Sequence, residues 1–357
     1  MEANRILIAA AGTGGHVFPG LAVATELKKM HQDVLWVGTA SGMESHLVPE
    51  HDITFFSINA KGLRGKGLVA RIKGLLGLVS ALWQSFKLLY QLKPNVVLCM
   101  GGYISGPVGL VARLRGIPLI VHEQNAIAGT TNKILARFSS WNLQAFPNVF
   151  GQKNTTTVGN PLRNVFQNNT LKPEGSSTKL HVLVVGGSLG AQAINDLMPE
   201  VYLQLQHDIA LWHQTGKHNI DSTLNQYDEQ GLKLSSVLRV DAFIADMAEA
   251  YTWADIVICR SGAMTVSELA AAGKPAILIP FPYAIDDHQT ANAKWLTEQG
   301  AAELIPQNQI SVSRLVDILS ELNQHKDRLS EMGHRAKAMA TFHATQKVAE
   351  KCLELAL

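Results

Sequence analysis

Short apolar runs alternate with helix-length segments along almost the whole chain of 357 residues. Each run has the length of one buried strand, and the segment after it is long enough for a helix that returns the chain to the same end of a sheet. This alternation is typical of parallel βα units, whose strands are covered by helices on both faces. The sequence therefore predicts an α/β fold with parallel sheets.

The expected strands fall into two series. The first series has strands at 5–10, 34–37, 96–99 and 118–121, with helices at 17–30, 66–91 and 105–114. The second series has strands at 180–185, 209–213, 237–240, 256–259 and 275–279. The polar segment 167–178 between them is typical of a surface crossing between domains. Because the chain also exceeds the size at which a single core keeps growing, we expect two domains.

Three glycine-rich turns each follow an apolar run and open a helix. They are 11–16 (AGTGGH), 101–106 (GGYISG) and 186–191 (GGSLGA). Glycine permits tight turns with positive φ, and its missing Cβ lets backbone N–H groups approach a ligand. Such N–H groups at the start of a helix favour phosphate oxygens. One turn of this kind could simply close a loop, but three turns in two matching series predict phosphate binding.

The spacing of these glycines argues against two nucleotide-binding families. A dinucleotide fold carries G-x-G-x-x-G, yet Val17 stands at the third glycine position of the first turn, and the turn at Gly186 also breaks the spacing. The chain has no G-x-x-x-x-G-K-[ST] motif of a P-loop NTPase. A net charge of +2 argues against a nucleic-acid partner. Three scattered cysteines offer neither a disulfide framework nor zinc spacing, which favours a reducing cytosol.

Polar side chains gather where the expected strands end. His16 stands at the start of the first helix, where capping or packing is as plausible as catalysis, and 122–125 (HEQN) follows the strand 118–121. Because site residues of α/β sheets collect at carboxyl strand ends, we favour a site over a solvated loop for 122–125. Glu268 lies on the helix after the strand 256–259, where a carboxylate can accept both hydroxyls of a ribose. Its position alone favours an ordinary glutamate that stabilises a helix dipole.

The group Asp286-Asp287-His288 suggests a metal site, because carboxylates and imidazole are metal ligands. The chain has no D-x-D spacing, however. We therefore prefer helix capping and contacts with sugar hydroxyls for this group, and we expect no metal site.

Five ordered stretches resemble the MurG family of bacterial peptidoglycan glycosyltransferases, which has the GT-B fold. They are 12–19 (GTGGHVFP), 100–107 (MGGYISGP), 122–125 (HEQN), 186–191 (GGSLGA) and 260–268 (RSGAMTVSE). The resemblance covers essentially the whole chain and implies two facing Rossmann-like domains with a cleft between them. It implies an acceptor- and membrane-binding domain at 1–162, a UDP-sugar-binding domain at 163–340 and a helix at 341–357 that packs back on the first domain.

The resemblance implies an inverting hexosyltransferase that moves N-acetylglucosamine from UDP-N-acetylglucosamine to the muramyl 4-hydroxyl of lipid I, giving lipid II for peptidoglycan synthesis. It implies no tightly bound metal. It further implies a peripheral enzyme on the anionic cytoplasmic face of the bacterial inner membrane, with cell-wall and division proteins as partners. Three rival functions stay open: another GT-B UDP-sugar transferase with a different lipid or small-molecule acceptor, a UDP-N-acetylglucosamine 2-epimerase, and a non-catalytic nucleotide-sugar binding module.

Carried over by motif, the resemblance also assigns residues to the site. The donor site receives Thr13, Gly14, Gly15, Asn125, Arg163, Ser188, Ile244, Ala263, Met264, Thr265, Val266, Ser267, Glu268 and Gln289. Within it, Ser188 meets the diphosphate, the Ile244 backbone meets uracil and Glu268 holds the ribose, while Asn125 and Gln289 reach the sugar hydroxyls. The acceptor diphosphate receives Gly12, Gly101, Gly102 and Tyr103. His16 and Glu123 are the candidates for the base on the acceptor hydroxyl, with His16 slightly favoured.

The expected helix 66–91 carries apolar residues at helical spacing. They are Leu68, Ile72, Leu75, Val79, Leu82, Trp83 and Phe86. Periodicity alone favours a helix packed on the sheet. The resemblance reverses that preference, because Ile72, Leu76, Val79 and Leu82 match the exposed bilayer patch of the family. Arg113 and Arg115 would assist on an anionic leaflet.

Overall fold

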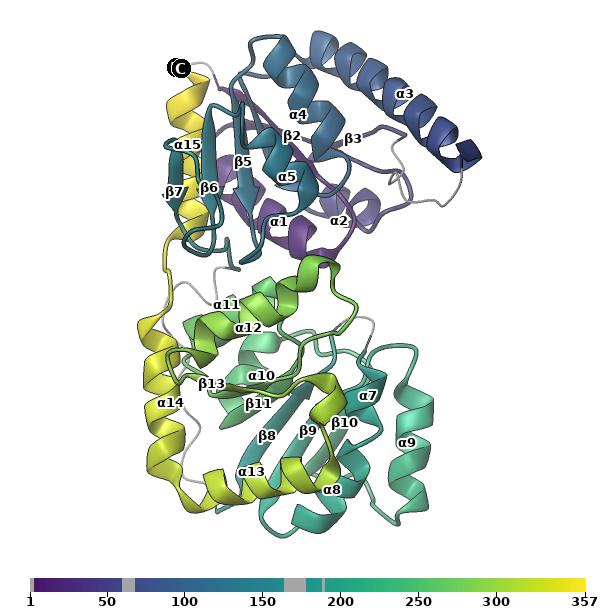
Figure 1. The fold of residues 1–357 in the computed structure, drawn as a ribbon, viewed down its shortest axis with the longest axis vertical. Helices are drawn as coiled ribbons and strands as arrows, with labels where there is room; N and C mark the ends of the chain where they lie inside the picture. Colours follow the sequence, from purple (N-terminus) through teal and green to yellow (C-terminus); the bar gives the residue numbers. More distant parts are fainter. Residues whose placement is uncertain (1–2, 60–67, 164–177, 188–189) are drawn as a thin grey trace. The chain divides into compact units, whose positions relative to one another are not determined.

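The computed structural model describes residues 3–59, 68–163, 178–187 and 190–357, with the backbone alone for 68–73. The chain forms two compact units (Figure 1). Unit 1 consists of 1–164 together with 341–357, and unit 2 consists of 165–340. Arg163, which the sequence assigned to the second domain, thus belongs to unit 1.

The sheet of unit 1 contains seven strands in the order β3-β2-β1-β4-β5-β6-β7, and all neighbouring pairs are parallel. The strands are β1 (Arg5–Ala10), β2 (Asp33–Gly38), β3 (Thr54–Ser57), β4 (Val96–Gly101), β5 (Leu119–Glu123), β6 (Trp141–Gln144) and β7 (Thr155–Thr157). The helices are α1 (Gly14–Lys29), α2 (Glu44–Glu50), α3 (Leu68–Leu92), α4 (Ser105–Leu114), α5 (Thr130–Leu135) and α15 (Ala344–Ala356).

The core of unit 1 lies on both faces of this sheet, because successive side chains of a strand point to opposite sides. Ile6 and Ile8 of β1 pack in one cluster with residues of α1 and α15. Leu7 and Ala9 pack in a second cluster with residues of α4 and α5. An apolar run of β1 therefore fills two cores at once, as expected for a strand of a parallel sheet.

The sheet of unit 2 contains six strands in the order β10-β9-β8-β11-β12-β13, again with parallel neighbours. The strands are β8 (Leu180–Val185), β9 (Ile209–Gln214), β10 (Leu238–Asp241), β11 (Ile256–Cys259), β12 (Ala276–Leu278) and β13 (Ala302–Leu304). The helices are α7 (Gln192–Asn195), α8 (Met198–Leu205), α9 (Ile220–Glu229), α10 (Met247–Trp253), α11 (Ala263–Ala272), α12 (His288–Thr297), α13 (Val312–Gln324) and α14 (Lys326–Ala338), with 3₁₀ turns η1 (Ile285–Asp287) and η2 (Gln307–Gln309).

Both sheets follow one topology, in which the first strand of each unit lies beside the fourth and the chain order reverses there. This switch point lies between β1 and β4 in unit 1 and between β8 and β11 in unit 2. Ligands of open α/β sheets bind outside the carboxyl ends of the strands at such points. All three predicted glycine turns begin there, and the α/β architecture of two parallel sheets is confirmed.

Candidate active site

Two glycine turns meet at the switch point of unit 1. Gly101 and Gly102 have φ of +113° and +78°, in the region that favours glycine. A Cβ on Gly102 would lie 2.3 Å from the carbonyl oxygen of Ala11, so no side chain fits there. The buried Ser105 hydroxyl accepts from the Gly101 N–H at 3.1 Å and lies 2.8 Å and 2.9 Å from the carbonyl oxygens of Gly101 and Ala9. Ser105 therefore fixes the ends of β1 and β4 together.

His16 lies in the first turn of α1, and its imidazole rests against Gly101. A Cβ on Gly101 would be 2.6 Å from Cδ2 and 2.8 Å from Nε2 of His16. The His16 backbone N–H donates to the Thr13 carbonyl at 3.0 Å, which closes the helix start. The side chain is half-buried, so the imidazole combines a fixed position with access to solvent. An imidazole in this setting can act as a general base at neutral pH.

A buried carboxylate limits what the first glycine turn can offer a phosphate. Glu44 accepts from the Thr39 N–H at 2.9 Å and from the Thr39 hydroxyl at 2.7 Å. Its other oxygen lies 3.5 Å from the N–H of Gly12, so that amide faces a carboxylate of the protein itself. Gly14 and Gly15 begin α1, and the first N–H groups of a helix have no carbonyl partner within it. These two amides are the better candidates for an anionic ligand.

Glu123 ends β5 and is only 2% exposed. Its Oε1 accepts from the backbone N–H and the Nδ2 of Asn125, at 3.0 Å and 3.1 Å. Its Oε2 accepts from the Gly129 N–H at 3.0 Å and from Asn132 Nδ2 at 2.8 Å. A carboxylate offers roughly four lone-pair sites, so these donors occupy all of them. Glu123 therefore positions the chain around Asn125.

His122 and Gln124 belong to the framework beneath this loop. Both side chains are buried, which rules out a solvated loop for this part of 122–125. Gln124 Nε2 donates to Nδ1 of His122 at 3.1 Å, and Nε2 of His122 donates to the Gly159 carbonyl at 3.1 Å. Burial lowers the pKa of His122 to about 4, although the bond to Gly159 opposes that shift. His122 is therefore neutral at pH 7 and acts as a structural link.

In unit 2, a buried network supports the glycine turn after β8. Ser188 of this turn lies outside the described residues. A Cβ on Gly190, whose φ is +78°, would lie 2.2 Å from the carbonyl oxygen of Thr215. Asn195 donates to that same oxygen at 2.9 Å, and its Oδ1 lies 3.1 Å from Nε2 of His213. The turn thus requires glycine at 190 and is held from below by Asn195 and His213.

Helix α11 carries the predicted nucleotide-lining residues 263–268 at the other side of this switch point. Glu268 is half-buried, and its Oε2 accepts from the hydroxyl of Tyr251 at 3.2 Å. Val266 has no exposed surface, so its side chain cannot line a ligand site in this structure. Ile244, predicted to meet uracil, follows β10, which lies two strands away from β8. The hydrogen bond from Tyr251 means that α10 orients the Glu268 carboxylate on α11.

The segment before α12 has a strained backbone, and its N-cap residue Asp287 makes no side-chain capping hydrogen bond, contrary to the predicted capping. Asp286 and Asp287 have φ of +53° and +52°, a region that non-glycine residues rarely occupy. Asp287 Oδ1 accepts from the Thr290 hydroxyl at 2.7 Å, and Nδ1 of His288 lies 2.7 Å from the Ile285 carbonyl oxygen. Within the described ranges, no three His, Cys, Asp or Glu side chains gather as a metal site would require.

The predicted site residues divide between the units. Unit 1 holds the acceptor residues Gly12, Gly101, Gly102 and Tyr103, the base candidates His16 and Glu123, and the donor residues Thr13, Gly14, Gly15, Asn125 and Arg163. Unit 2 holds the donor residues Ile244, Ala263, Met264, Thr265, Val266, Ser267, Glu268 and Gln289. Sequence reasoning missed the residues that hold these groups in place, among them Ser105, Glu44 and Asn132.

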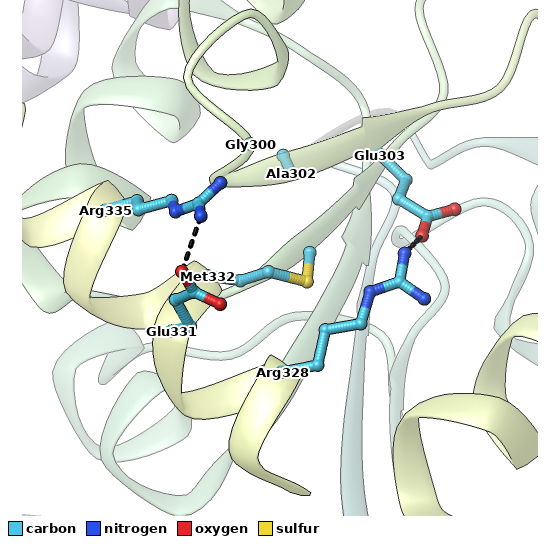
Figure 2. A pocket seen from close by; sticks show the side chains of 7 residues that line it. All are labelled: Gly300, Ala302, Glu303, Arg328, Glu331, Met332 and Arg335. Atoms are coloured by element: carbon cyan, nitrogen blue, oxygen red, sulfur yellow. Dashed lines mark hydrogen bonds and ion pairs between the residues drawn. The ribbon is translucent and has the colours of Figure 1, made fainter. Parts of the chain in front are cut away.

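A pocket of about 330 Å³ lies away from the glycine turns, between α14 and β13 of unit 2 (Figure 2). Its charged side chains pair with one another, since Arg328 binds Glu303 at 2.8 Å and Arg335 binds Glu331. Figure 2 shows both pairs at the pocket wall, with Met332 between them. A wall of neutralised pairs offers no nucleophile or base, so we assign no reaction to this pocket.

The apolar side chains on α3 and α4 form an exposed surface, which we call the apolar patch. It consists of Leu75, Leu76, Val79, Trp83, Phe86 and Tyr90 of α3 with Leu110 and Leu114 of α4. Leu76 and Val79, both predicted, are 64% and 57% exposed. Leu82 instead packs against the core, which corrects its predicted place in the patch, and the side chain of Ile72 lies outside the described residues.

Basic residues accompany the apolar patch. The Arg115 guanidinium lies over the rings of Phe86 and Tyr90, at 5.1 Å and 5.3 Å from their centroids. Lys87 Nζ lies 5.8 Å from the ring centroid of Trp83. Helices α3 and α4, which carry these side chains, pack against each other (Figure 1). In the part of the chain that the structure describes, no helix is long and apolar enough to cross a bilayer.

Comparisons with known proteins cover nearly the whole chain. The model of the glycosyltransferase family 28 N-terminal domain matches residues 6–141, and that of the C-terminal domain matches 181–349. A Shewanella woodyi protein named UDP-N-acetylglucosamine–N-acetylmuramyl-(pentapeptide) pyrophosphoryl-undecaprenol N-acetylglucosamine transferase is 48% identical over 99% of this chain and 98% of its own. A relative of the same name from Shewanella amazonensis is 49% identical over the same shares. The crystal structure of Acinetobacter baumannii MurG matches with a TM-score of 0.83 and 38% identity, over 98% of this chain and 99% of that one.

Proposed function

We propose that this chain, which belongs to glycosyltransferase family 28, transfers N-acetylglucosamine from UDP-N-acetylglucosamine to the muramyl 4-hydroxyl of lipid I. The observation that carries this proposal is 48% identity over nearly the full length of relatives named for that donor and an undecaprenyl-linked muramyl acceptor. The GT-B fold agrees with the match to Acinetobacter baumannii MurG. Two switch points, one bordered by two of the glycine turns and the other by the third, suit the two diphosphate-bearing substrates.

In the proposed reaction, His16 takes the proton from the acceptor hydroxyl as that oxygen attacks the anomeric carbon of the donor sugar. The bond between this carbon and the β-phosphate oxygen breaks, UDP leaves, and the anomeric centre inverts. Glu123 supports the reaction by holding Asn125, which would contact the sugar. The dipole of α11, together with the glycine turn after β8, would stabilise the negative charge that develops on UDP.

We further propose that the enzyme acts as a peripheral protein on the anionic cytoplasmic face of the bacterial inner membrane, where lipid I is anchored. The apolar patch supports this proposal, because exposed apolar area next to Arg115 and Lys87 suits an interface of acyl chains and anionic headgroups. Cell-wall and division proteins are the partners that we expect there. We also propose that transfer needs no tightly bound metal ion, since the charge on UDP has α11 and the glycine turn to stabilise it.

An assay of UDP release tests this function. The protein is mixed with radiolabelled UDP-N-acetylglucosamine, with and without a lipid I analogue and with and without a chelator. We expect UDP release and labelled lipid product only with the acceptor, unchanged by the chelator. Release without acceptor, or conversion of the donor to its 2-epimer, would instead support an epimerase. Binding of the donor with no turnover at all would support a non-catalytic module, and turnover with other acceptors only would support a different transferase.

A further inference from the structure

The guanidinium of Arg260 joins the carboxyl ends of three neighbouring strands in unit 2. Arg260 directly follows β11, and its Nη1 donates to the carbonyl oxygens of Ile279 and Pro280, which follow β12, at 3.1 Å and 3.2 Å. Its Nη2 donates to Oε1 of Gln307, in the 3₁₀ turn after β13, at 2.6 Å. Nη2 of Arg260 is thus held by Gln307, while its Nη1 holds the loop after β12.

The peptide between Pro280 and Phe281 transmits this arrangement. Arg260 donates to the carbonyl oxygen of this peptide, which belongs to Pro280. The N–H of the same peptide, which belongs to Phe281, donates to Oε1 of Gln289 at 2.9 Å. Because a peptide is planar and its C=O and N–H point in opposite directions, fixing one group fixes the direction of the other. The Phe281 ring also lies 5.6 Å from the Arg260 guanidinium, which adds a cation–π contact. The orientation of the Gln289 amide therefore depends on where Arg260 is held.

The hydrogen bond from the Phe281 N–H also decides which end of the Gln289 amide group, the oxygen or the NH₂, points to a ligand. Its amide oxygen is engaged by the Phe281 N–H, so its NH₂ group is the end left to turn outward. An NH₂ group donates only, so a sugar hydroxyl bound there would have to accept. Arg260 is itself partly buried, and burial lowers its pKa. Removing the acceptor at Gln307 would leave part of a desolvated cation unpaired and free to shift.

We propose that Gln307 is a positioning residue for the donor sugar. It holds Arg260 in place, Arg260 fixes the Pro280–Phe281 peptide, and this peptide turns the NH₂ group of Gln289 towards the sugar. The proposal rests on the proposed function and on the predicted contact of Gln289 with the donor sugar. It predicts a defect confined to the sugar, since Gln307 acts on the loop after β12 and not on the uracil, ribose or diphosphate contacts.

The test compares three variants of the full chain. In Gln307→Ala we expect the KM for UDP-N-acetylglucosamine to rise on the order of tenfold, while the Kd for UDP stays within about twofold of wild type. Gln307→Glu keeps an acceptor for the guanidinium and should stay within about twofold for both ligands. Gln309→Ala is the matched control, because Gln309 lies on the same 3₁₀ turn but binds Arg314 on the surface.

The outcomes separate a positioning role from a structural one. An unchanged KM for Gln307→Ala would overturn the proposal. Equal weakening of UDP and UDP-N-acetylglucosamine would also overturn it, because a general loss of structure affects both ligands. If Gln307→Glu raised the KM as much as Gln307→Ala does, that result would also overturn the proposal. If wild type shows no acceptor-dependent turnover, the proposed function fails, yet Kd values for UDP and its sugar conjugate still test Gln307.

Discussion

Asn132 Nδ2 donates to Oε2 of Glu123 at 2.8 Å, as one of four donors around this buried carboxylate. Gln in place of Glu123 would turn one acceptor oxygen into a donor that faces two other donors. In Glu123→Gln we therefore expect kcat to fall about a hundredfold and the melting temperature to drop, because buried donors lose their acceptor. The pH profile of kcat/KM should keep its shape, since His16 carries the proton. A profile that loses its acidic limb in this variant would instead make Glu123 the base.

Gly101→Ala should lower kcat by displacing the His16 imidazole. The new Cβ would meet Cδ2 of His16 at 2.6 Å, so the ring must leave its position. We expect a loss of at least tenfold in kcat, measured by UDP release. Gly116→Ala is the control: its φ of +73° imposes similar backbone strain, but its Cβ would meet nothing within 4 Å. Equal effects on kcat in both variants would mean that strain, and not the histidine, limits activity.

Unit 2 should lose stability in mild acid because His213 is buried. Burial lowers the pKa of His213 to about 3, below its ordinary value of 6.5. The unfolded chain therefore takes up a proton near pH 6.5 while the folded chain does not. The free energy of unfolding should fall by about 1.4 kcal/mol per pH unit as the pH drops from about 6.5 towards 3.

Hydrogen exchange of the β9 amides at several pH values measures this dependence. His213→Gln should flatten it while lowering stability at neutral pH. The same substitution at His122, in unit 1, serves as the control and should leave the β9 amides unchanged. An identical pH slope in wild type and His213→Gln would assign the acid sensitivity to other groups.

The apolar patch should control binding to vesicles. Val79→Glu places a carboxylate at a side chain that is 57% exposed, where it meets both an apolar phase and anionic headgroups. We expect sedimentation with vesicles that contain anionic lipid to fall at least fivefold, and wild-type binding to weaken as salt rises. Leu234→Glu, at a leucine of similar exposure in unit 2, should bind as wild type does. Equal losses for both variants would indicate a nonspecific charge effect.

Elements marked by a clear apolar run could be predicted well, whereas several short strands could not. The bounds of β1, β8, β11 and α4 agree with the sequence prediction, because each is an apolar run or a helix start marked by glycine. The prediction missed β3, β6, β7 and β13. Of these, β7 consists of three threonines at the edge of the sheet and forms no apolar run. An edge strand is recognised by the neighbour it pairs with, which the sequence alone does not reveal.

The candidate site also contains residues that the sequence marks and residues that only the fold reveals. His16 and Glu123 stand beside glycine turns or strand ends and were candidates from the sequence. Asn132 was not, because its importance comes from a carboxylate nine residues earlier that it meets only in the folded loop. Leu82 was placed in the apolar patch by the family resemblance, whereas helical periodicity, which favoured packing on the sheet, agrees with its contact with the core.

Helix α15 has a consequence for how the protein is made. Its Val348, Ala349 and Cys352 complete the core cluster that contains Ile6 and Ile8 of the first strand. On the ribosome, β1 emerges at the start of synthesis, whereas α15 emerges only after the whole of unit 2. Domains usually fold in the order in which they leave the ribosome. Unit 2 can therefore fold first, and the core of unit 1 that α1 covers on one face of the sheet remains incomplete until α15, more than three hundred residues later in the sequence, is made.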